Sequence, residues 1–290
     1  MTDRQKRMIV GLALGVLISL FIHLGTRREG SVLTNLLDGY EYQSYDARMR
    51  ARSGNVEEAS IDDVVIIDIE QNSVVTLGNY HQWPHAYHGQ LIDVVSSGNP
   101  KALIFDIIFD PKTSDTYNLV ESLSWNQANS LPEVKTAADQ FLVSHDPGRF
   151  IWSTSQSAVT HHALVFEAED SLNFLYAMDA VPPGYDAAKH TIKVSSKTAN
   201  QLPEAARLGN TYLELLNNTA GAGSANFPLD EDGIIRRAPT AVHFKGSGEV
   251  FLSLTLSAVK DVLGIATNGF DYDFDEGLLR LTDTSGVVVR

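Results

Sequence analysis

The sequence of 290 residues contains no cysteine. Disulfide bonds, thiolate metal sites and cysteine nucleophiles are therefore excluded. An excess of basic residues is lacking as well, since 36 Asp and Glu residues face 22 Lys and Arg residues and the formal net charge is -14. A surface of this sign repels nucleic acid, and no basic patch is large enough to reverse that. We therefore expect no nucleic-acid partner.

The motifs of common enzyme classes are also lacking. Residues 220–223 are rich in glycine, but no strand precedes them and no Lys follows, as a phosphate-binding loop would require. No Gly-x-Ser-x-Gly nucleophile elbow occurs. The sequence therefore predicts neither a cyclase nor a kinase active site, and we expect no cofactor.

A long hydrophobic run occurs only near the N-terminus. Residues 8–24 form 17 positions with one His and no formal charge, which is near the lower limit for a membrane span. Basic residues precede this run and favour a cytoplasmic N-terminus. The alternative is a cleaved signal peptide, but no small-x-small cleavage site follows. We predict a cytoplasmic segment 1–7, an uncleaved transmembrane anchor 8–26 and an extracytoplasmic domain 27–290.

Two short apolar runs organise the rest of the chain. Residues 64–70 and 102–110 are rich in β-branched and aromatic side chains, as is typical of strands buried on both faces. Residues 83–98 between them predict a crossover helix with Pro84 in its first turn and Gly98 at its end. This βαβ pattern predicts an α/β fold with a mixed, largely parallel sheet flanked by helices, preceded by one N-terminal transmembrane helix.

Further elements follow from apolar periodicity and turn residues. Strands are predicted at 150–154, 163–166, 270–275 and 278–281. Helices are predicted at 31–52, 133–143, 211–217 and 250–263, and Gly264 after the last of them suits a helix C-terminus. The Asp-Gly step in residues 230–233 predicts a turn that joins segments 224–228 and 234–244 as a hairpin.

Acidic residues lie near the C-terminal ends of the two predicted parallel strands, where open α/β sheets bind ligands. They are Asp68, Glu70, Asp106 and Asp110. These carboxylates could bind a hard cation or accept hydrogen bonds from a ligand. The alternative is that Asp68 and Asp106 cap helices or anchor loops, and Asp106 between apolar neighbours is expected to serve folding more than catalysis.

Other polar and aromatic residues are weaker candidates. Trp83 either packs on the sheet or stacks on a ligand. Arg236 is a candidate for ligand binding, and one of Arg236 and Arg237 could instead pair with a carboxylate at the edge of the core. His85 and His88 have helical spacing that permits metal binding, but no carboxylate accompanies them, so no metal site is predicted. His161 and His162 are expected to be exposed at the start of a strand.

The order of several motifs resembles a known family. The motifs are 45–48 (Tyr-Asp-Ala-Arg), 64–70, Trp83 with Pro84, 101–109 and 226–237. Together they resemble the second type of CHASE domain, the cyclase/histidine-kinase-associated sensory extracellular domain, over about residues 35–265. The resemblance implies an extracytoplasmic α/β input domain in a bacterial signalling protein, with a nucleotide cyclase, histidine kinase or Ser/Thr kinase as output.

The sequence departs from the family pattern at two places. His85 stands where members often have Arg after Trp-Pro, and the chain ends at Arg290 where the family's domain continues into its last strands. We therefore expect a sensor domain that is incomplete at its C-terminus and lacks its output.

These observations predict a sensory input domain of the bacterial inner membrane, with a single span and the main domain in the periplasm. The expected partners are the membrane, bound through the N-terminal helix, and an unknown small ligand or protein; a homodimer is left open. One alternative is a surface domain that assembles with itself or with a partner. The other is a metal-dependent hydrolase that uses Asp68, Asp106 and Asp110.

Overall fold

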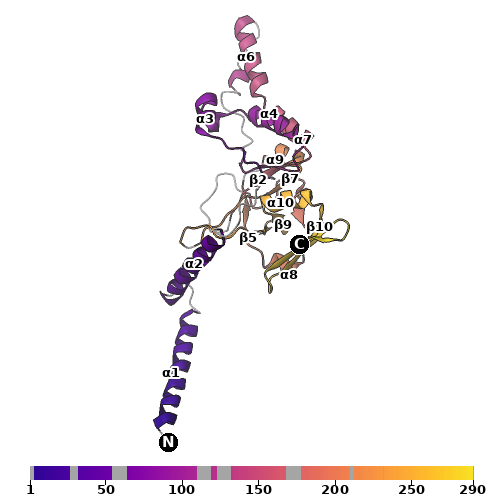
Figure 1. Ribbon diagram of the computed structural model, residues 1–290. Coiled ribbons are helices and arrows are strands. Elements are labelled where there is room, and N and C mark those ends of the chain that lie inside the picture. The colour runs from indigo at the N-terminus through magenta and orange to yellow at the C-terminus, as the bar shows by residue number, and fades with distance from the viewer. Residues whose placement is uncertain are drawn as a thin grey trace. The chain divides into compact units, whose positions relative to one another are not determined.

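A computed structural model of the chain describes residues 3–26, 32–53, 64–109, 119–122, 132–167, 178–209, 212–230 and 232–289. The chain divides into two compact units, Met1–Ile69 and Glu70–Arg290. Figure 1 labels their helices and strands. The candidate site lies wholly in the second unit.

The described part of the first unit contains two helices and the irregular segment 64–69. Helix α1 spans Asp3–Thr26 and helix α2 spans Val32–Ser53. Within α1, Arg4–His23 is the one described stretch that is long and apolar enough to cross a membrane, and it is not buried. A core helix of a soluble protein would be mostly buried, whereas an anchor or a signal sequence would not, so the uncleaved anchor stays a prediction.

The predicted strand at residues 64–70 is wrong. These residues belong to no strand and no helix, and Val65 and Ile66 are 82% and 87% exposed. A strand is defined by the hydrogen bonds it makes to a neighbouring strand, and apolar composition alone does not supply them. The composition of the run therefore did not specify a pairing.

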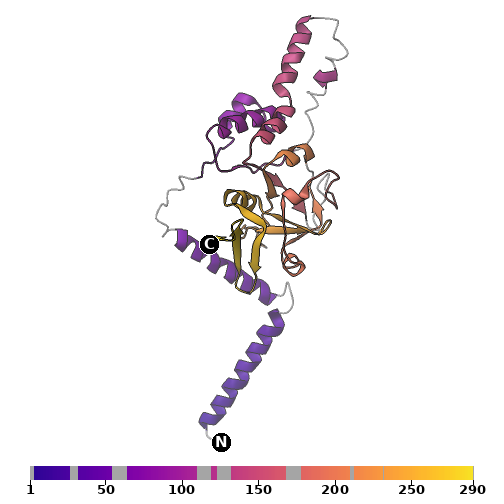
Figure 2. The same cartoon turned by 90° about the vertical axis from the view of Figure 1, so that its right-hand side faces the viewer.

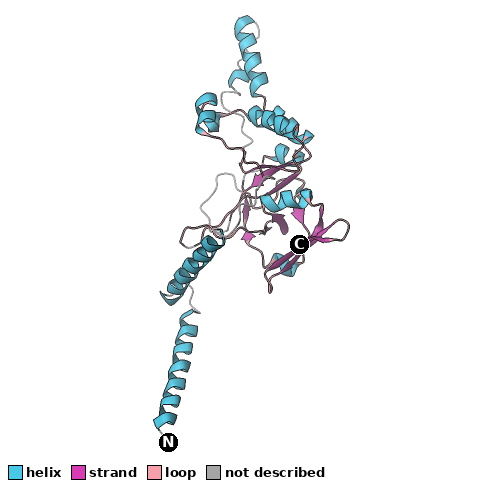
Figure 3. Cartoon of the chain, in the orientation of Figure 1, coloured by secondary structure: helices cyan, strands magenta, loops and turns pink. Residues whose placement is uncertain are grey.

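The second unit contains a parallel three-stranded sheet in the order β1-β2-β7. The strands are β1 (Leu103–Phe105), β2 (Thr160–Leu164) and β7 (Gly221–Ser224). Phe105 lies opposite His162, and His162 lies opposite Ala222. Helices lie in the chain between β1 and β2 and between β2 and β7. The predicted mixed α/β class, with a parallel sheet flanked by helices, is therefore confirmed, and Figure 3 distinguishes its helices and strands by colour.

Three helices contribute to the core on one face of this sheet: α4 (His85–Ser96), α7 (Gly148–Gln156) and α9 (Leu213–Asn218). Ile92, Phe150 and Leu215 pack there around Phe105. Helix α4 begins after Pro84 and ends before Gly98, as predicted.

The strand predicted at 150–154 is wrong, because these residues lie in helix α7. A Cβ on Gly89 of α4 would stand 3.0 Å from the carbonyl oxygen of Arg149. This close approach lets Phe150 reach the core as part of a helix. Packing between two helices has therefore overridden the strand preference of an aromatic and β-branched run.

Helix α10 (Leu254–Val262) contacts strands β1, β2 and β7. Gly223 of β7 permits this packing, since a Cβ there would lie 2.7 Å from the backbone nitrogen of Leu254. His161 Nε2 lies 2.9 Å from Asp261 Oδ2 and so links β2 to the end of α10. Gly264 with φ 64° follows the helix, as predicted.

A second sheet has the order β4-β9-β8-β5, and two smaller sheets accompany it. The remaining described helices are α3 (Gln71–Leu77), η1 (Tyr80–Gln82), α6 (Pro132–His145), η2 (Ala187–Lys189) and α8 (Ser196–Ala199). The remaining strands are β3 (Phe166–Glu167), β4 (Thr191–Ile192), β5 (Glu204–Ala205), β6 (Arg207–Leu208), β8 (Ala241–Phe244), β9 (Glu249–Leu252), β10 (Ile265–Asp273), β11 (Leu278–Asp283) and β12 (Val288–Val289).

The second segment of the predicted hairpin pairs with a different strand in the structure. The turn is present, since Gly233 N donates to Asp230 O at 2.8 Å. However, β8 pairs with β9 rather than with residues 224–228. The two strands predicted near the C-terminus are confirmed, and they form the antiparallel pair β10 and β11, the yellow strands of Figure 2.

Candidate functional site

The structure does not gather the four predicted carboxylates, as far as they are described, at one edge of a sheet. Asp68 lies in the exposed segment 64–70, and Glu70 precedes α3 without a side-chain hydrogen bond that caps the helix. Asp110 lies outside the described residues. Asp106 follows β1 directly, at the C-terminal edge of the parallel sheet where a site was expected.

Trp83 has a packing role at the start of α4. Its Nε1 donates to the carbonyl oxygen of Gly78 at 2.9 Å. Its ring lies 5.3 Å from the ring of Tyr80, edge to face, and 6.3 Å from that of Tyr87. The indole of Trp83 therefore packs on residues that are close to it in the sequence. Among the described residues, these contacts account for its position without a stacked ligand.

Arg236 pairs with carboxylates of the adjacent turn. Its guanidinium is 4% exposed, with 3.2 Å between Nη1 and Asp230 Oδ2 and 2.8 Å between Nη2 and Asp232 Oδ2. The hydrogen bonds of Arg236 hold the pKa of Asp232 below its ordinary value. The partners therefore lie in the turn and not at the edge of the core as expected, and ligand binding by Arg236 stays a prediction.

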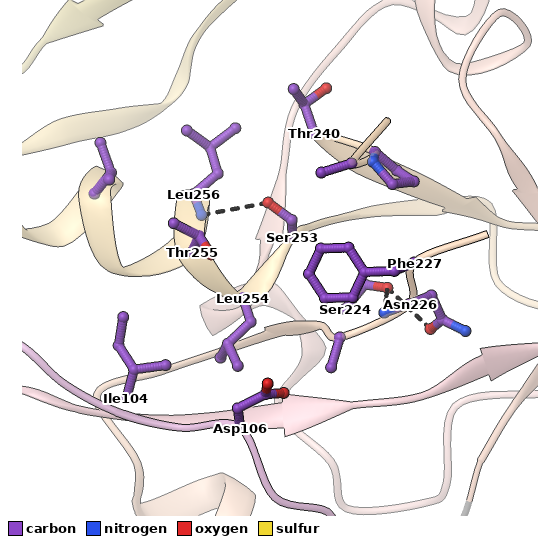
Figure 4. A pocket seen from close by; sticks show the side chains of 14 residues that line it. Ile104, Asp106, Ser224, Asn226, Phe227, Thr240, Ser253, Leu254, Thr255 and Leu256 are labelled. Atoms are coloured by element: carbon purple, nitrogen blue, oxygen red, sulfur yellow. Dashed lines mark hydrogen bonds between the residues drawn. The ribbon is translucent and has the colours of Figure 1, made fainter. Parts of the chain in front are cut away.

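A cavity of about 350 Å³ lies at the C-terminal ends of β1 and β7, beside the first turn of α10. Figure 4 shows Asp106 and Ile104 from the β1 segment facing Leu254 across it. The alternation of a strand explains this placement, because Phe105 between them points to the other face of the sheet. Cavities at this edge of an α/β sheet are common ligand sites.

Several polar groups in the cavity wall are already hydrogen-bonded. Asn226 Oδ1 accepts from Phe166 N at 2.8 Å, and Asn226 Nδ2 donates to Phe166 O at 2.7 Å. Ser224 Oγ donates to Asn226 Oδ1 at 3.0 Å. Ser253 Oγ caps α10 by accepting from Leu256 N. These groups therefore shape the wall.

Asp106 differs from these groups. Its side chain is exposed and has no hydrogen-bond or ion-pair partner within the described part of the chain. The expected burial of Asp106 is therefore wrong, because the strand ends at Phe105 and the next side chain turns into the cavity. Its expected role in folding stays a prediction.

The two histidines of β2 are another correction. His161 and His162 were expected to be exposed, but each is 1% exposed. Burial lowers the pKa of His162 to about 3, helped by the neighbouring His161. Burial also lowers the pKa of His88 to about 4, helped by His85. The apolar run that follows His162 was the signal that these residues begin an interior strand.

Metal binding receives no support from the described residues. Among them, no group of three or more His, Asp or Glu side chains could hold a metal ion. The carboxylates of the hydrolase hypothesis include Asp110, which is outside the described range. Sequence reasoning also missed the wall formed by residues 224–227 and the start of α10, although residues 226–237 had been singled out as a motif.

The comparisons with known proteins agree with the fold and the motifs. The model of the CHASE2 domain family matches residues 15–287, which is nearly the whole chain. No curated protein and no solved structure matches the chain. The parallel sheet, the cavity at its C-terminal edge and this match lead to one conclusion: the chain belongs to the CHASE2 family of sensory extracellular domains.

Proposed function

We propose that this chain is the extracytoplasmic input domain of a bacterial membrane signalling protein and that its cavity binds a small signal molecule. The observation that carries the proposal is the cavity of about 350 Å³ at the C-terminal edge of the parallel sheet. Its volume falls in the range of small-molecule sites, and its walls are mainly apolar. Helix α1 supplies a membrane anchor of suitable length.

Signalling requires more than binding. A ligand shifts a protein between two states only when its affinity for the two states differs. The output, such as a cyclase or kinase, would read this shift through the segments that enter the membrane. We therefore expect ligand binding in the cavity to change the backbone dynamics of α2, the helix that follows the anchor.

The test begins with a small-molecule screen on the full chain in lipid nanodiscs, read by the thermal unfolding midpoint. Ala238 lines the cavity on an exposed segment, so Ala238→Trp should fill the cavity without disturbing the core. Ala188→Trp is the matched control at an exposed position of η2, outside the cavity. True ligands should stabilise the parent and Ala188→Trp, but not Ala238→Trp.

Hydrogen exchange then separates binding from sensing. A ligand that binds in the cavity should also change the exchange protection of amides in α2. If ligands stabilise Ala238→Trp as much as the parent, the cavity is not the site. If ligands bind there and leave α2 unchanged, the domain binds a molecule but the proposed sensing through α2 is wrong.

Self-assembly is a second candidate function, favoured by the exposed run at residues 64–67. Four consecutive Val and Ile side chains are between 51% and 87% exposed there. An apolar and exposed segment that belongs to no strand or helix is suited to pairing with a strand of a second copy. Ile66→Lys should then lower the oligomeric state measured by sedimentation in micelles, whereas Val94→Lys, at an exposed position of α4, should not.

A further inference from the structure

The cavity beside α10 offers a ligand apolar walls and one charged side chain. Ile104, Phe227 and Leu254 supply apolar surface, and Figure 4 shows the carboxylate of Asp106 at the foot of the cavity, below Leu254. The lining residues that the structure describes include no Lys or Arg. The charge of Asp106 is therefore not neutralised by another side chain of the wall.

Most other polar groups of the wall are committed to the protein. Asn226 uses both atoms of its amide to hold Phe166, and Ser253 caps α10. A ligand that bonded to these groups would have to break existing hydrogen bonds. Asp106 and the exposed hydroxyl of Thr255 have no hydrogen-bond partner in the described chain and remain available.

Resting on the proposed role of the cavity as the signal site, we propose that the ligand is an organic cation: a compact apolar body with a protonated amine that donates to Asp106. Hydrogen bonds to a charged partner are stronger than neutral ones. An anionic ligand would meet the carboxylate of Asp106, and the described lining residues include no basic side chain to offset the repulsion.

The N-terminus of α10 acts in the opposite sense, but more weakly. A helix N-terminus carries roughly half an elementary charge, and this effect fades within the first turn. One of the first-turn N–H groups, that of Leu256, already donates to Ser253 Oγ. The full charge of Asp106 therefore dominates the choice between a cation and an anion.

Three probes of similar size and shape test the inference: 2-phenylethylamine, 2-phenylethanol and 3-phenylpropionate. Their dissociation constants are measured by ligand-observed NMR on the full chain in nanodiscs at pH 7, with empty nanodiscs as the blank. The amine should bind about tenfold or more tighter than the other two. Asp106→Asn should remove this preference, whereas Asp275→Asn, an exposed carboxylate outside the cavity, should keep it.

The inference is overturned if the amine shows no binding, if the alcohol or the acid binds as tightly, or if Asp106→Asn leaves the affinity for the amine unchanged. Ala238→Trp distinguishes this failure from failure of the proposed function. If the probes bind without preference and Ala238→Trp blocks them, the cavity is a ligand site and the cation assignment is wrong. If Ala238→Trp blocks none of them, the cavity itself is not the site.

Discussion

Mild acid should unfold the second unit because three of its histidines are buried and neutral in the folded state. Burial lowers the pKa to about 3 for His162 and to about 4 for His88. For His190, burial also lowers the pKa to about 4, although its hydrogen bond to a backbone carbonyl opposes the shift. In the unfolded chain each of these side chains titrates near pH 6.5.

The direction of the effect follows from proton uptake. Above pH 6.5 each histidine is neutral in both states, so the folded state keeps its full stability. As the pH falls from 6.5 to 4, the unfolded chain binds protons that the folded chain does not bind, and stability falls. Each histidine then costs about 3 kcal/mol at pH 4, and together they approach the whole stability of a typical domain, about 5–15 kcal/mol.

Carboxylates act in a lower pH range. Burial raises the pKa of Asp261, but hydrogen bonds from His161 and Lys260 outweigh it and hold the pKa below its ordinary value. The stability from such a group is present above pH 3.8 and is lost as the pH falls further towards the folded pKa. Loss of stability between pH 6.5 and pH 4 therefore reports mainly on the histidines.

The assay is urea unfolding of the full chain in micelles, followed by far-UV circular dichroism at pH 7, 6, 5 and 4. His162→Phe removes the titrating ring while keeping an aromatic side chain, and the site adjoins a small cavity of about 10 Å³. Neither ring nitrogen of His162 has a hydrogen-bond partner to lose in the structure. The variant should match the parent at pH 7 and exceed its stability by about 3 kcal/mol at pH 4.

The control is His81→Gln, since His81 is exposed and should not change the acid sensitivity. The reasoning is refuted if the parent is equally stable at pH 7 and pH 4. It is also refuted if His162→Phe loses as much stability as the parent over this range.

Three further predictions concern the architecture around the cavity. Gly223→Ala should lower the free energy of unfolding by about 1–3 kcal/mol in urea unfolding, because the added Cβ would meet the backbone of Leu254. Gly39→Ala in α2 should not lower it, because no atom lies near that Cβ. Asn226→Ala should cost about 1–3 kcal/mol in urea unfolding through its lost bonds to Phe166, and an unchanged midpoint would contradict the role of the amide as a clamp. Arg236→Gln should speed limited proteolysis in residues 228–236, since the ion pairs that close the turn are lost; an unchanged cleavage rate would show that the turn holds without them.

Local signals predicted much of the fold correctly. Pro84 and Gly98 marked the ends of α4, and Gly264 marked the end of α10. The alternating residues near the C-terminus predicted the two strands that are β10 and β11. These features depend on backbone preferences of a few neighbouring residues, such as the fixed φ of Pro and the freedom of Gly, so they can be read along the chain.

The family and the position of Asp106 at a sheet edge were also determined by the sequence, but the site was not. The cavity needs Asp106, Asn226 and Leu254 to come together, although Asp106 lies 120 and 148 positions before the other two. Only the parallel order β1-β2-β7 and the close contact of Gly223 with α10 bring them together. Likewise, residues 150–154 became helix α7, and residues 64–70 joined no strand, because pairing and packing depend on distant partners that no local pattern specifies.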